Sequence, residues 1–244
     1  MILTFALTSS FTASAQNATE IVQKADQKFN GEKSSYSEMT MTIVRPKYTR
    51  EITFKSWTEG RDLAMTLITA PAQDKGQSFL KNGNNMWSWN PTIQRLIKLP
   101  PSMMSQGWMG SDYTNDDLLK ESSIVSDYTH KILKDETIYG YDCYVIQLLP
   151  KPSADVVWAK IILWISKNGY MMMKSEYYDE DLSLVKTNLA HDVKTFDGRT
   201  LPSVMEIVPA DEKGYKTKVD ITTMNFNHSK GTSFYSQQNM KKLR

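Results

Sequence analysis

Hydrophobic residues recur at every second position along much of this chain, and turn-forming residues interrupt the runs at short intervals. Met39, Met41 and Ile43, for example, alternate with the residues between them. This period of two predicts strands, because successive side chains of a strand point to opposite faces of its sheet. Short strands separated by turns predict an antiparallel meander rather than alternating strands and helices. Turn signals lie at Gly60, Pro71, Gly76, Asn82-Gly83, Asn168-Gly169, Asp197-Gly198 and Lys213-Gly214.

The expected fold is mainly β, an α+β arrangement of about eleven strands and two or three short helices in a single domain. Several of the expected strands are apolar on both faces. One face of such a strand can pack on a neighbour, and the other must meet a helix, a second sheet or a ligand. The clearest example is 156–165, where Trp158, Ile162 and Trp164 alternate with Val157, Ile161 and Leu163.

Residues 17–31 are predicted to form the first helix. Asn17 and Glu20 have the spacing of a capping box, and Gly31 stands where a helix commonly ends. The apolar residues recur with helical spacing, so this helix has a face to pack against the rest of the protein. That face consists of Ile21, Val22, Ala25 and Phe29.

A second, short helix is predicted directly after Thr114. A threonine can cap the first turn of a helix, and acidic residues in that turn complement the helix dipole. Asp116 and Asp117 supply these acids, and Leu118 and Leu119 follow them. The helix start explains the paired carboxylates without any catalytic role.

Composition excludes several classes of protein. The chain has 244 residues, of which 40% are hydrophobic and 23% are charged, so it is expected to fold around a core. Its formal net charge of +2 and the lack of a basic cluster argue against a nucleic-acid partner. Cys143 is the single cysteine, so an intramolecular disulfide is excluded, and a small buried residue is the expected role.

The N-terminus resembles a secretory signal peptide over residues 1–15. An apolar run precedes Ala13-Ser14-Ala15, a small-residue pattern typical of a cleavage site, which places the expected cut before Gln16. The alternative is a short buried N-terminal helix. No other segment has the ~20 uninterrupted apolar residues that a membrane span needs. We therefore expect residues 16–244 to form one soluble, exported domain.

No catalytic or metal-binding motif is present. His130, His191 and His228 lie far apart, without metal-ligand spacing, and there is no G-x-S-x-G elbow, phosphate-binding loop or dinucleotide fingerprint. The acidic run at 179–181 fits a solvated hairpin tip. We expect no enzymatic activity, no metal and no cofactor.

Residues 85–119 hold the strongest candidate binding site. This stretch concentrates large apolar side chains around one arginine, Arg95, and part of it is a loop with Pro, Gly and Ser. An apolar patch on such a loop usually marks binding, and methionine suits surfaces that fit several ligands. The alternative is that these side chains are core. The candidates are Trp87, Trp89, Met103, Met104, Trp108 and Met109, of which the last four would line a cavity or form a mobile lid.

A second set of candidates lies on the expected strands. Their alternation could point them into the same cavity, which would then be apolar and rich in methionine. These residues are Met39, Met41, Ile43, Phe54 and Met65.

The same region resembles a known family. Trp87, Trp89, Pro91, Arg95 and Leu99, followed by the run MGSDYTNDDL at 109–118, are similar to the signature of the LolA-like outer-membrane lipoprotein-sorting proteins. The similarity extends over most of the chain after residue 16. It is closer to the broad LolA-like branch associated with RND-type exporters than to the classical carrier.

The resemblance implies a periplasmic carrier with a LolA/LolB-like fold. In that family an incomplete antiparallel barrel of eleven or so strands wraps a hydrophobic cavity, and helices form its lid. The implied ligands are lipoprotein acyl chains or a lipid. An inner-membrane exporter of the RND or ABC type would be the partner, with transient membrane contact and a monomeric carrier. The family also uses an arginine near its lid. No motif matches that arginine to Arg45, Arg50 or Arg95, so the role is assigned to none of them.

A sensor is the main alternative on the same fold. Such a module would bind a lipoprotein or a membrane-protein partner as a signal and would not transfer it. Transfer between membranes distinguishes the carrier from the sensor.

Overall fold

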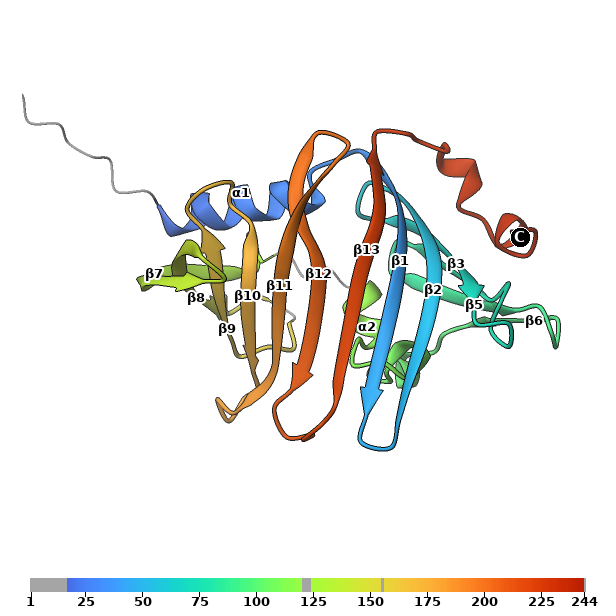
Figure 1. Cartoon of the computed structure of the whole chain (residues 1–244), viewed down its shortest axis with the longest axis horizontal. Helices are drawn as coiled ribbons and strands as arrows, with labels where there is room; N and C mark the ends of the chain where they lie inside the picture. Colours follow the sequence, from blue (N-terminus) through green and yellow to red (C-terminus); the bar gives the residue numbers. More distant parts are fainter. Residues whose placement is uncertain (1–16, 120–123, 155, 244) are drawn as a thin grey trace, which may run out of the picture.

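The computed structural model describes residues 17–119, 124–154 and 156–243, and its strands form one antiparallel sheet (Figure 1). The expected signal peptide, 1–15, lies outside these residues. The strands are β1 (Ser34–Arg45), β2 (Tyr48–Glu59), β3 (Leu63–Ala70), β4 (Ser78–Asn82), β5 (Asn85–Asn90), β6 (Arg95–Lys98), β7 (Tyr128–Ile138), β8 (Tyr141–Pro150), β9 (Lys160–Ser166), β10 (Met172–Tyr178), β11 (Leu184–Phe196), β12 (Arg199–Pro209) and β13 (Lys216–Phe226).

The order of the strands shows two meanders joined side by side. From one edge to the other the sheet runs β6-β5-β4-β3-β2-β1-β13-β12-β11-β10-β9-β8-β7. Strands β1 and β13 pair in antiparallel register, so the first and last strands meet at the centre. The sheet is therefore open, with β6 and β7 as its two edges.

The predicted mainly β class is confirmed, and the predicted number of strands is wrong. The sheet has 13 strands, where about eleven were expected. The shortest strands are β4, β5 and β6, which contain only five, six and four residues, and each still pairs with its neighbours.

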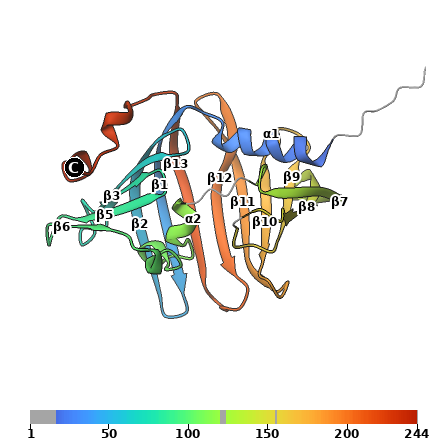
Figure 2. The same cartoon turned by 180° about the vertical axis from the view of Figure 1, so that it is seen from behind.

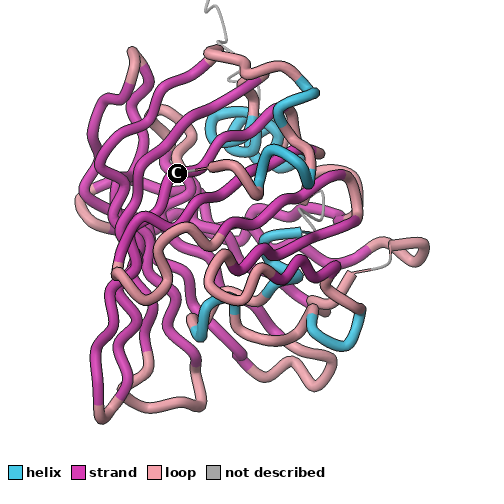
Figure 3. Tube along the Cα trace, turned by 90° about the vertical axis from the view of Figure 1, so that its right-hand side faces the viewer, coloured by secondary structure: helices cyan, strands magenta, loops and turns pink. Residues whose placement is uncertain are grey.

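The helices are few and short. They are α1 (Ala18–Asn30), α2 (Asn115–Leu119) and α3 (Gln237–Met240), with single 3-10 turns at Pro101–Met103, Trp108–Gly110 and Thr232–Phe234. Helices α1 and α2 lie on the same side of the central strands (Figures 2 and 3). We call the sheet face toward them the inner face. Within the described residues, no helix has the length and hydrophobicity needed to cross a membrane.

Helix α1 forms where the sequence predicts it. The side chain of Asn17 accepts a hydrogen bond from the backbone N–H of Thr19 at 3.0 Å and caps the helix. Ile21, Val22 and Ala25 are buried against residues of β7, β8 and β9. Burying an aliphatic side chain of this size contributes about 1.5–3 kcal/mol, so this face fixes the helix on the sheet.

One detail of α1 differs from the prediction: Phe29 is 42% exposed rather than buried with the rest of the apolar face. Gly31 ends the helix as predicted, with a right-handed φ of −78°. Glycine is needed there because a Cβ atom would lie 2.3 Å from the carbonyl oxygen of Gln27.

The C-terminal segment covers the outer face of one half of the sheet. Helix α3 lies against β4, where the Ser78 hydroxyl donates to the carbonyl oxygen of Met240 at 2.8 Å. Tyr235 and Met240 are buried with Met65 and Leu80 of the sheet. Both faces of this half are therefore apolar and covered.

Cys143 is fully buried, as expected for a small core residue. Burial raises the pKa of its thiol to about 11, because a thiolate is poorly solvated in the core. The thiol is therefore protonated and unreactive at neutral pH.

Candidate functional site

Two cavities lie on the inner face, beneath α1 and the segment that follows β6. We call residues 99–119 the cover segment, because it runs from β6 across the central strands to α2. The larger cavity has a volume of about 410 Å³ and lies between α1, α2 and β9 to β12. The smaller has a volume of about 210 Å³ and lies between the cover segment and β1 to β5. Only the larger falls within the range of about 300–1,000 Å³ that is usual for small-molecule sites.

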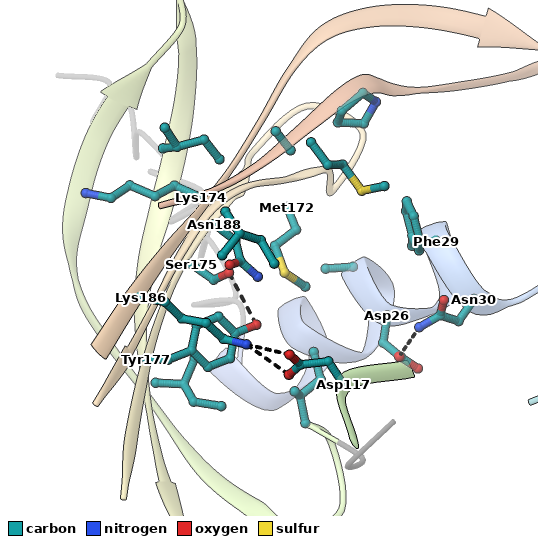
Figure 4. Close-up of a pocket in the computed structure, with 18 of the residues that line it drawn as sticks. Asp26, Phe29, Asn30, Asp117, Met172, Lys174, Ser175, Tyr177, Lys186 and Asn188 are labelled. Atoms are coloured by element: carbon teal, nitrogen blue, oxygen red, sulfur yellow. Dashed lines mark hydrogen bonds and ion pairs between the residues drawn. The ribbon is translucent and has the colours of Figure 1, made fainter. Parts of the chain in front are cut away.

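The large cavity has mostly apolar walls with a few polar groups among them (Figure 4). Such a lining suits a ligand with a long hydrocarbon part, because apolar surface is buried while polar groups fix orientation. The apolar lining includes Phe29, Leu118, Trp158, Ile161, Tyr170, Met172, Ala190, Leu201, Met205 and Ile207.

An ion pair joins α2 to the wall of the large cavity. The ammonium of Lys186 on β11 lies 2.9 Å from both carboxylate oxygens of Asp117, and the lysine side chain is only 9% exposed. The same ammonium lies 5.1 Å from the ring centroid of Trp158 and 5.3 Å from that of Tyr177. Lys186 is thus a buried cation among aromatic rings, neutralised by a residue of the cover segment.

Asp117 also fixes the start of α2. Its carboxylate accepts a hydrogen bond from the N–H of Thr114 at 2.9 Å, and its own N–H donates to the Thr114 hydroxyl at 2.9 Å. This reciprocal arrangement is a capping box. It confirms the predicted helix start, and it places the carboxylate where Lys186 can reach it.

Further polar groups lie beside Lys186. The Tyr177 hydroxyl accepts a hydrogen bond of 3.4 Å from Ser175, and burial raises the pKa of Tyr177, which keeps the phenol neutral. The side-chain oxygen of Asn188 is buried and has no hydrogen-bond partner in the described part of the chain. At the α1 side of the cavity, Asp26 accepts a hydrogen bond from Asn30 at 3.3 Å and is ion-paired with Arg61.

A buried arginine fastens the cover segment at its other end. Arg45 of β1 donates to Asp112 at 3.1 Å and to the carbonyl oxygen of Gly110 at 2.8 Å. The two charged side chains are 9% and 6% exposed. Asp112 also accepts a hydrogen bond of 2.7 Å from Thr217 of β13, so it spans the two central strands.

A second arginine contacts the same loop. Arg50 of β2 donates to the carbonyl oxygen of Met109 at 3.2 Å and is ion-paired with Asp74. Met109 has a left-handed φ of 55°, which is unfavourable for a residue other than glycine. The arginine therefore helps to hold a strained turn of the cover segment against the sheet. Arg45 and Arg50 thus both serve the cover segment.

Trp108 fills much of the space on the small-cavity side. It is 5% exposed, and its ring meets Phe54 at 5.4 Å and Phe79 at 5.3 Å between centroids, both edge-on. Edge-to-face aromatic pairs add to the stability gained by burial. The small cavity is therefore the space left beside a packed aromatic core.

The cover segment separates the two cavities. Tyr113 and Leu118 from this segment and Met205 from β12 line both cavities.

The structure brings together seven of the predicted site residues. Four line the small cavity, and three more pack in the same hydrophobic cluster, so the sequence located this half of the inner face. Met39, Met41, Phe54 and Trp108 line the cavity; Ile43, Met104 and Met109 pack beside it. Met103, at the 3-10 turn Pro101–Met103, is half-buried.

The structure does not place Met65, Trp87 and Trp89 inward, as the alternation suggested. Met65 lies opposite Trp57 and Leu80 in the sheet, on the outer face, while Ala64 on the same strand lines the small cavity. The reason is that the C-terminal segment packs on this outer face. Apolar residues therefore occur at both sets of alternating positions, and alternation alone does not show which set points inward.

Arg95 is also absent from both cavities. It is exposed and pairs with Asn90 at the end of the β5–β6 hairpin, away from the cover segment. Arg95 is thus an exposed arginine on an edge strand.

None of the predicted residues lines the large cavity. Its polar residues were missed because Asp117 was explained by the helix start alone and Lys186 lies in an ordinary strand. One signal was present: Lys186, Asn188 and Ala190 alternate on β11 with the inward period. A lysine in that series is unusual, since an inward position normally carries an apolar side chain.

Comparisons with known proteins place the fold. A family model described as "uncharacterized protein" matches residues 60–242, about three-quarters of the chain. No curated protein sequence matches. Among solved structures, a DUF1329 family protein from Desulfovibrio piger has a TM-score of 0.80 at 22% identity, covering 91% of this chain and 97% of that chain.

Two further structures are similar over a comparable length. An outer membrane lipoprotein-sorting protein domain from Vibrio parahaemolyticus has a TM-score of 0.78 at 21% identity, covering 92% of this chain and 98% of that chain. A LolA superfamily protein from Nitrosomonas europaea has a TM-score of 0.73 at 22% identity, covering 92% and 99%. The TM-scores establish a shared fold. At identities this low the ligand has to be argued from the cavity itself.

Proposed function

We propose that this chain, which belongs to the LolA-like family of proteins, is a periplasmic carrier that binds the acyl chains of a lipoprotein, or a lipid, and moves it toward the outer membrane. The observation that carries the proposal is the large, mostly apolar cavity beneath the cover segment. The fold alone does not specify the ligand, because one fold can serve many functions.

The energetics of such a cavity suit a hydrocarbon ligand. Each buried CH₂ group contributes about 0.8 kcal/mol, so a long acyl chain can supply roughly 10 kcal/mol before the costs of association. A carrier must also release its ligand. A cover segment held by ion pairs and apolar contacts offers a reversible way to open the cavity, since these contacts can form again after release.

The proposed activity is binding and transfer without chemistry. Among the described residues, no group of three His, Cys, Asp or Glu side chains could hold a metal ion. Most charged residues of the cavity are engaged in ion pairs, and the Lys186–Asp117 pair positions the cover segment. We therefore assign these residues to binding and opening rather than to catalysis.

Export and membrane partners complete the proposal. Cleavage before Gln16 would release the mature protein into the periplasm, where an inner-membrane exporter of the RND or ABC type would supply the ligand to a monomer. N-terminal sequencing of the protein from a periplasmic fraction tests the export step. An uncleaved product in the cytoplasm would contradict it.

Two measurements test the carrier function. The first is displacement of a fluorescent polyene fatty acid from the purified protein by unlabelled lipids. The second is transfer of a pyrene-labelled phospholipid between donor and acceptor vesicles, which a carrier accelerates in proportion to its concentration. Binding without accelerated transfer would support the sensor, and the absence of binding would overturn both functions.

A further inference from the structure

Lys186 is the feature of the large cavity that an acyl-chain carrier does not require. Hydrocarbon chains need no cation, yet this ammonium lies in the wall of the cavity with a side chain that is 9% exposed. A buried charge is costly unless it is paired and hydrogen-bonded. A protein that bound only neutral lipid would be more stable with an apolar residue at this position.

The partner of Lys186 belongs to the helix that borders both cavities. Both oxygens of Asp117 contact the ammonium, and Asp117 lies on α2 in the cover segment. When α2 moves away to admit a ligand, Asp117 leaves the lysine. The cavity wall then contains a buried cation without a counterion, which opposes opening.

Other carboxylates near the cavity are poorly placed to replace Asp117. Glu206 is paired with Lys216 at 3.0 Å, and Asp26 is paired with Arg61. Asp116 is the neighbour of Asp117 on α2 and would move with it. Among the described residues, the carboxylates near the cavity are thus either paired elsewhere or move with α2, and an anionic ligand can neutralise Lys186 in the open state.

The groups around Lys186 can hold a small anionic headgroup. Tyr177 and Ser175 offer hydroxyl groups, and the side chain of Asn188 points to the same region (Figure 4). The buried oxygen of Asn188 lacks a partner among the described residues and can accept a hydrogen bond from a ligand hydroxyl or amide. Apolar residues such as Met172 and Leu201 lie beyond them for a chain.

We propose that the large cavity selects amphiphiles with an anionic headgroup, a carboxylate or a phosphate, on a long hydrocarbon chain. The headgroup replaces Asp117 at Lys186, and the chain occupies the apolar part of the cavity. This inference rests on the proposed function, since it assumes that the cavity binds acyl chains. It adds a headgroup preference and a trigger: an anion releases α2 and a neutral lipid does not.

The test compares ligands that share a chain and differ in headgroup. Palmitate, hexadecyl phosphate and hexadecanol displace a neutral fluorescent probe, N-phenyl-1-naphthylamine, from the full chain. A hydrogen bond to a charged group is stronger than one between neutral groups, so we expect at least one anion to bind about tenfold or more tightly than hexadecanol. A preference for palmitate assigns a fatty-acid type of ligand, and a preference for hexadecyl phosphate assigns a phospholipid type.

Variants of Lys186 link the preference to this residue. Lys186→Met should lose the tenfold preference for the anion, because the cation that opposes opening for a neutral ligand is gone, and Lys186→Arg should keep it. Lys160→Met is the matched control, because Lys160 also lies over a tyrosine ring, that of Tyr178, and does not line the cavity. Thermal melts verify that each variant is folded.

Asp117→Asn provides a second, independent variant. It removes the competing carboxylate and leaves Lys186 in place, so affinity for the anionic ligand should rise several-fold while affinity for hexadecanol changes little. This variant carries the test if Lys186→Met fails to fold.

The outcomes separate this inference from the carrier function. If no ligand displaces the probe, the carrier function fails along with it. If hexadecanol binds the wild type as tightly as both anions, or if Lys186→Met keeps the preference, the headgroup assignment is overturned and the carrier function stands.

Discussion

The two cavities of the inner face differ in what fills them. On the side of β1 to β5, Trp108 occupies the space between Phe54 and Phe79, and about 210 Å³ is left. On the side of β9 to β12, α1 and α2 stand off the sheet and leave about 410 Å³. The same cover segment borders both, through Tyr113 and Leu118.

The polar groups differ as well. Apolar side chains dominate the smaller cavity. The larger contains the Lys186–Asp117 ion pair and the side-chain oxygen of Asn188, which has no hydrogen-bond partner within the described residues. Space filled by apolar side chains is typical of a hydrophobic core, and a buried charge beside empty space is typical of a binding site. The comparison therefore assigns stability to the smaller cavity and ligand binding to the larger.

The largest expected effect comes from emptying the small-cavity side. Trp108→Ala should reduce the free energy of unfolding by about 3–5 kcal/mol, because it removes a buried aromatic side chain and its two ring contacts. The measurement is urea unfolding followed by circular dichroism. Met103→Ala with Met104→Ala is the control, since both side chains are only half-buried and should cost less. A loss below ~1 kcal/mol for Trp108→Ala would show that the residue belongs to a loose lid.

The buried ion pair of the cover segment should have the next largest effect. Asp112→Asn should cost roughly 1.5–3 kcal/mol, because Arg45 then remains buried beside a neutral partner. Hydrogen exchange over residues 108–117 should become faster as the loop loosens. Glu136→Gln, which breaks an exposed pair with Lys134, should leave stability unchanged. Equal effects of the two variants would mean that the Arg45 pair does not hold the segment.

Filling each cavity in turn distinguishes them by function. Ala190 lines the large cavity and Ala64 lines the small one. Because both positions have empty space beside them, Ala190→Phe and Ala64→Phe should each change stability by about 1 kcal/mol or less. Only Ala190→Phe should block displacement of the fluorescent fatty acid. The reverse pattern would move the ligand site to the small cavity.

The smallest expected effect is a dependence of stability on pH at His130, on the large-cavity side. One ring nitrogen of His130 lies 2.7 Å from the carbonyl oxygen of Ile124 and the other 3.0 Å from the Thr19 hydroxyl of α1. Burial lowers the pKa of His130, so the folded state binds a proton less readily than the unfolded state. The contribution of His130 to the free energy of unfolding is therefore fully present above its unfolded pKa of about 6.5, and it is lost as the pH falls below that value.

His130→Gln should remove this dependence. Melting temperatures of the wild type and the variant between about pH 7 and pH 5 measure it, and the two should converge at the acidic end. Parallel curves for the two proteins would assign the acid sensitivity to other groups.

The sequence predicted the elements of this fold better than it predicted their faces. Asn17 and Thr114 mark helix starts by local capping, which depends on nearby residues alone. The facing of Met65 depends on residues such as Tyr235 and Met240, which are far away in the chain and cover the outer face. Alternation cannot distinguish the two faces of a strand when both are apolar.

The large cavity could not be predicted from local sequence patterns, for a related reason. Lys186 and Asp117 are separated by most of a meander, and their pairing appears only when α2 crosses the sheet. The Trp-rich stretch was easier to find, because apolar residues concentrated in a loop are a local signal. That signal located the cover segment and the small cavity, and it gave no indication of the large cavity.

The cover segment also has a topological role. It belongs to the connection from β6 to β7, and these are the two edge strands of the sheet. The two ends of this connection are covalently joined to opposite edges of the sheet. Its attachment at both edges limits its travel, so it cannot swing free as a flap hinged at one end does.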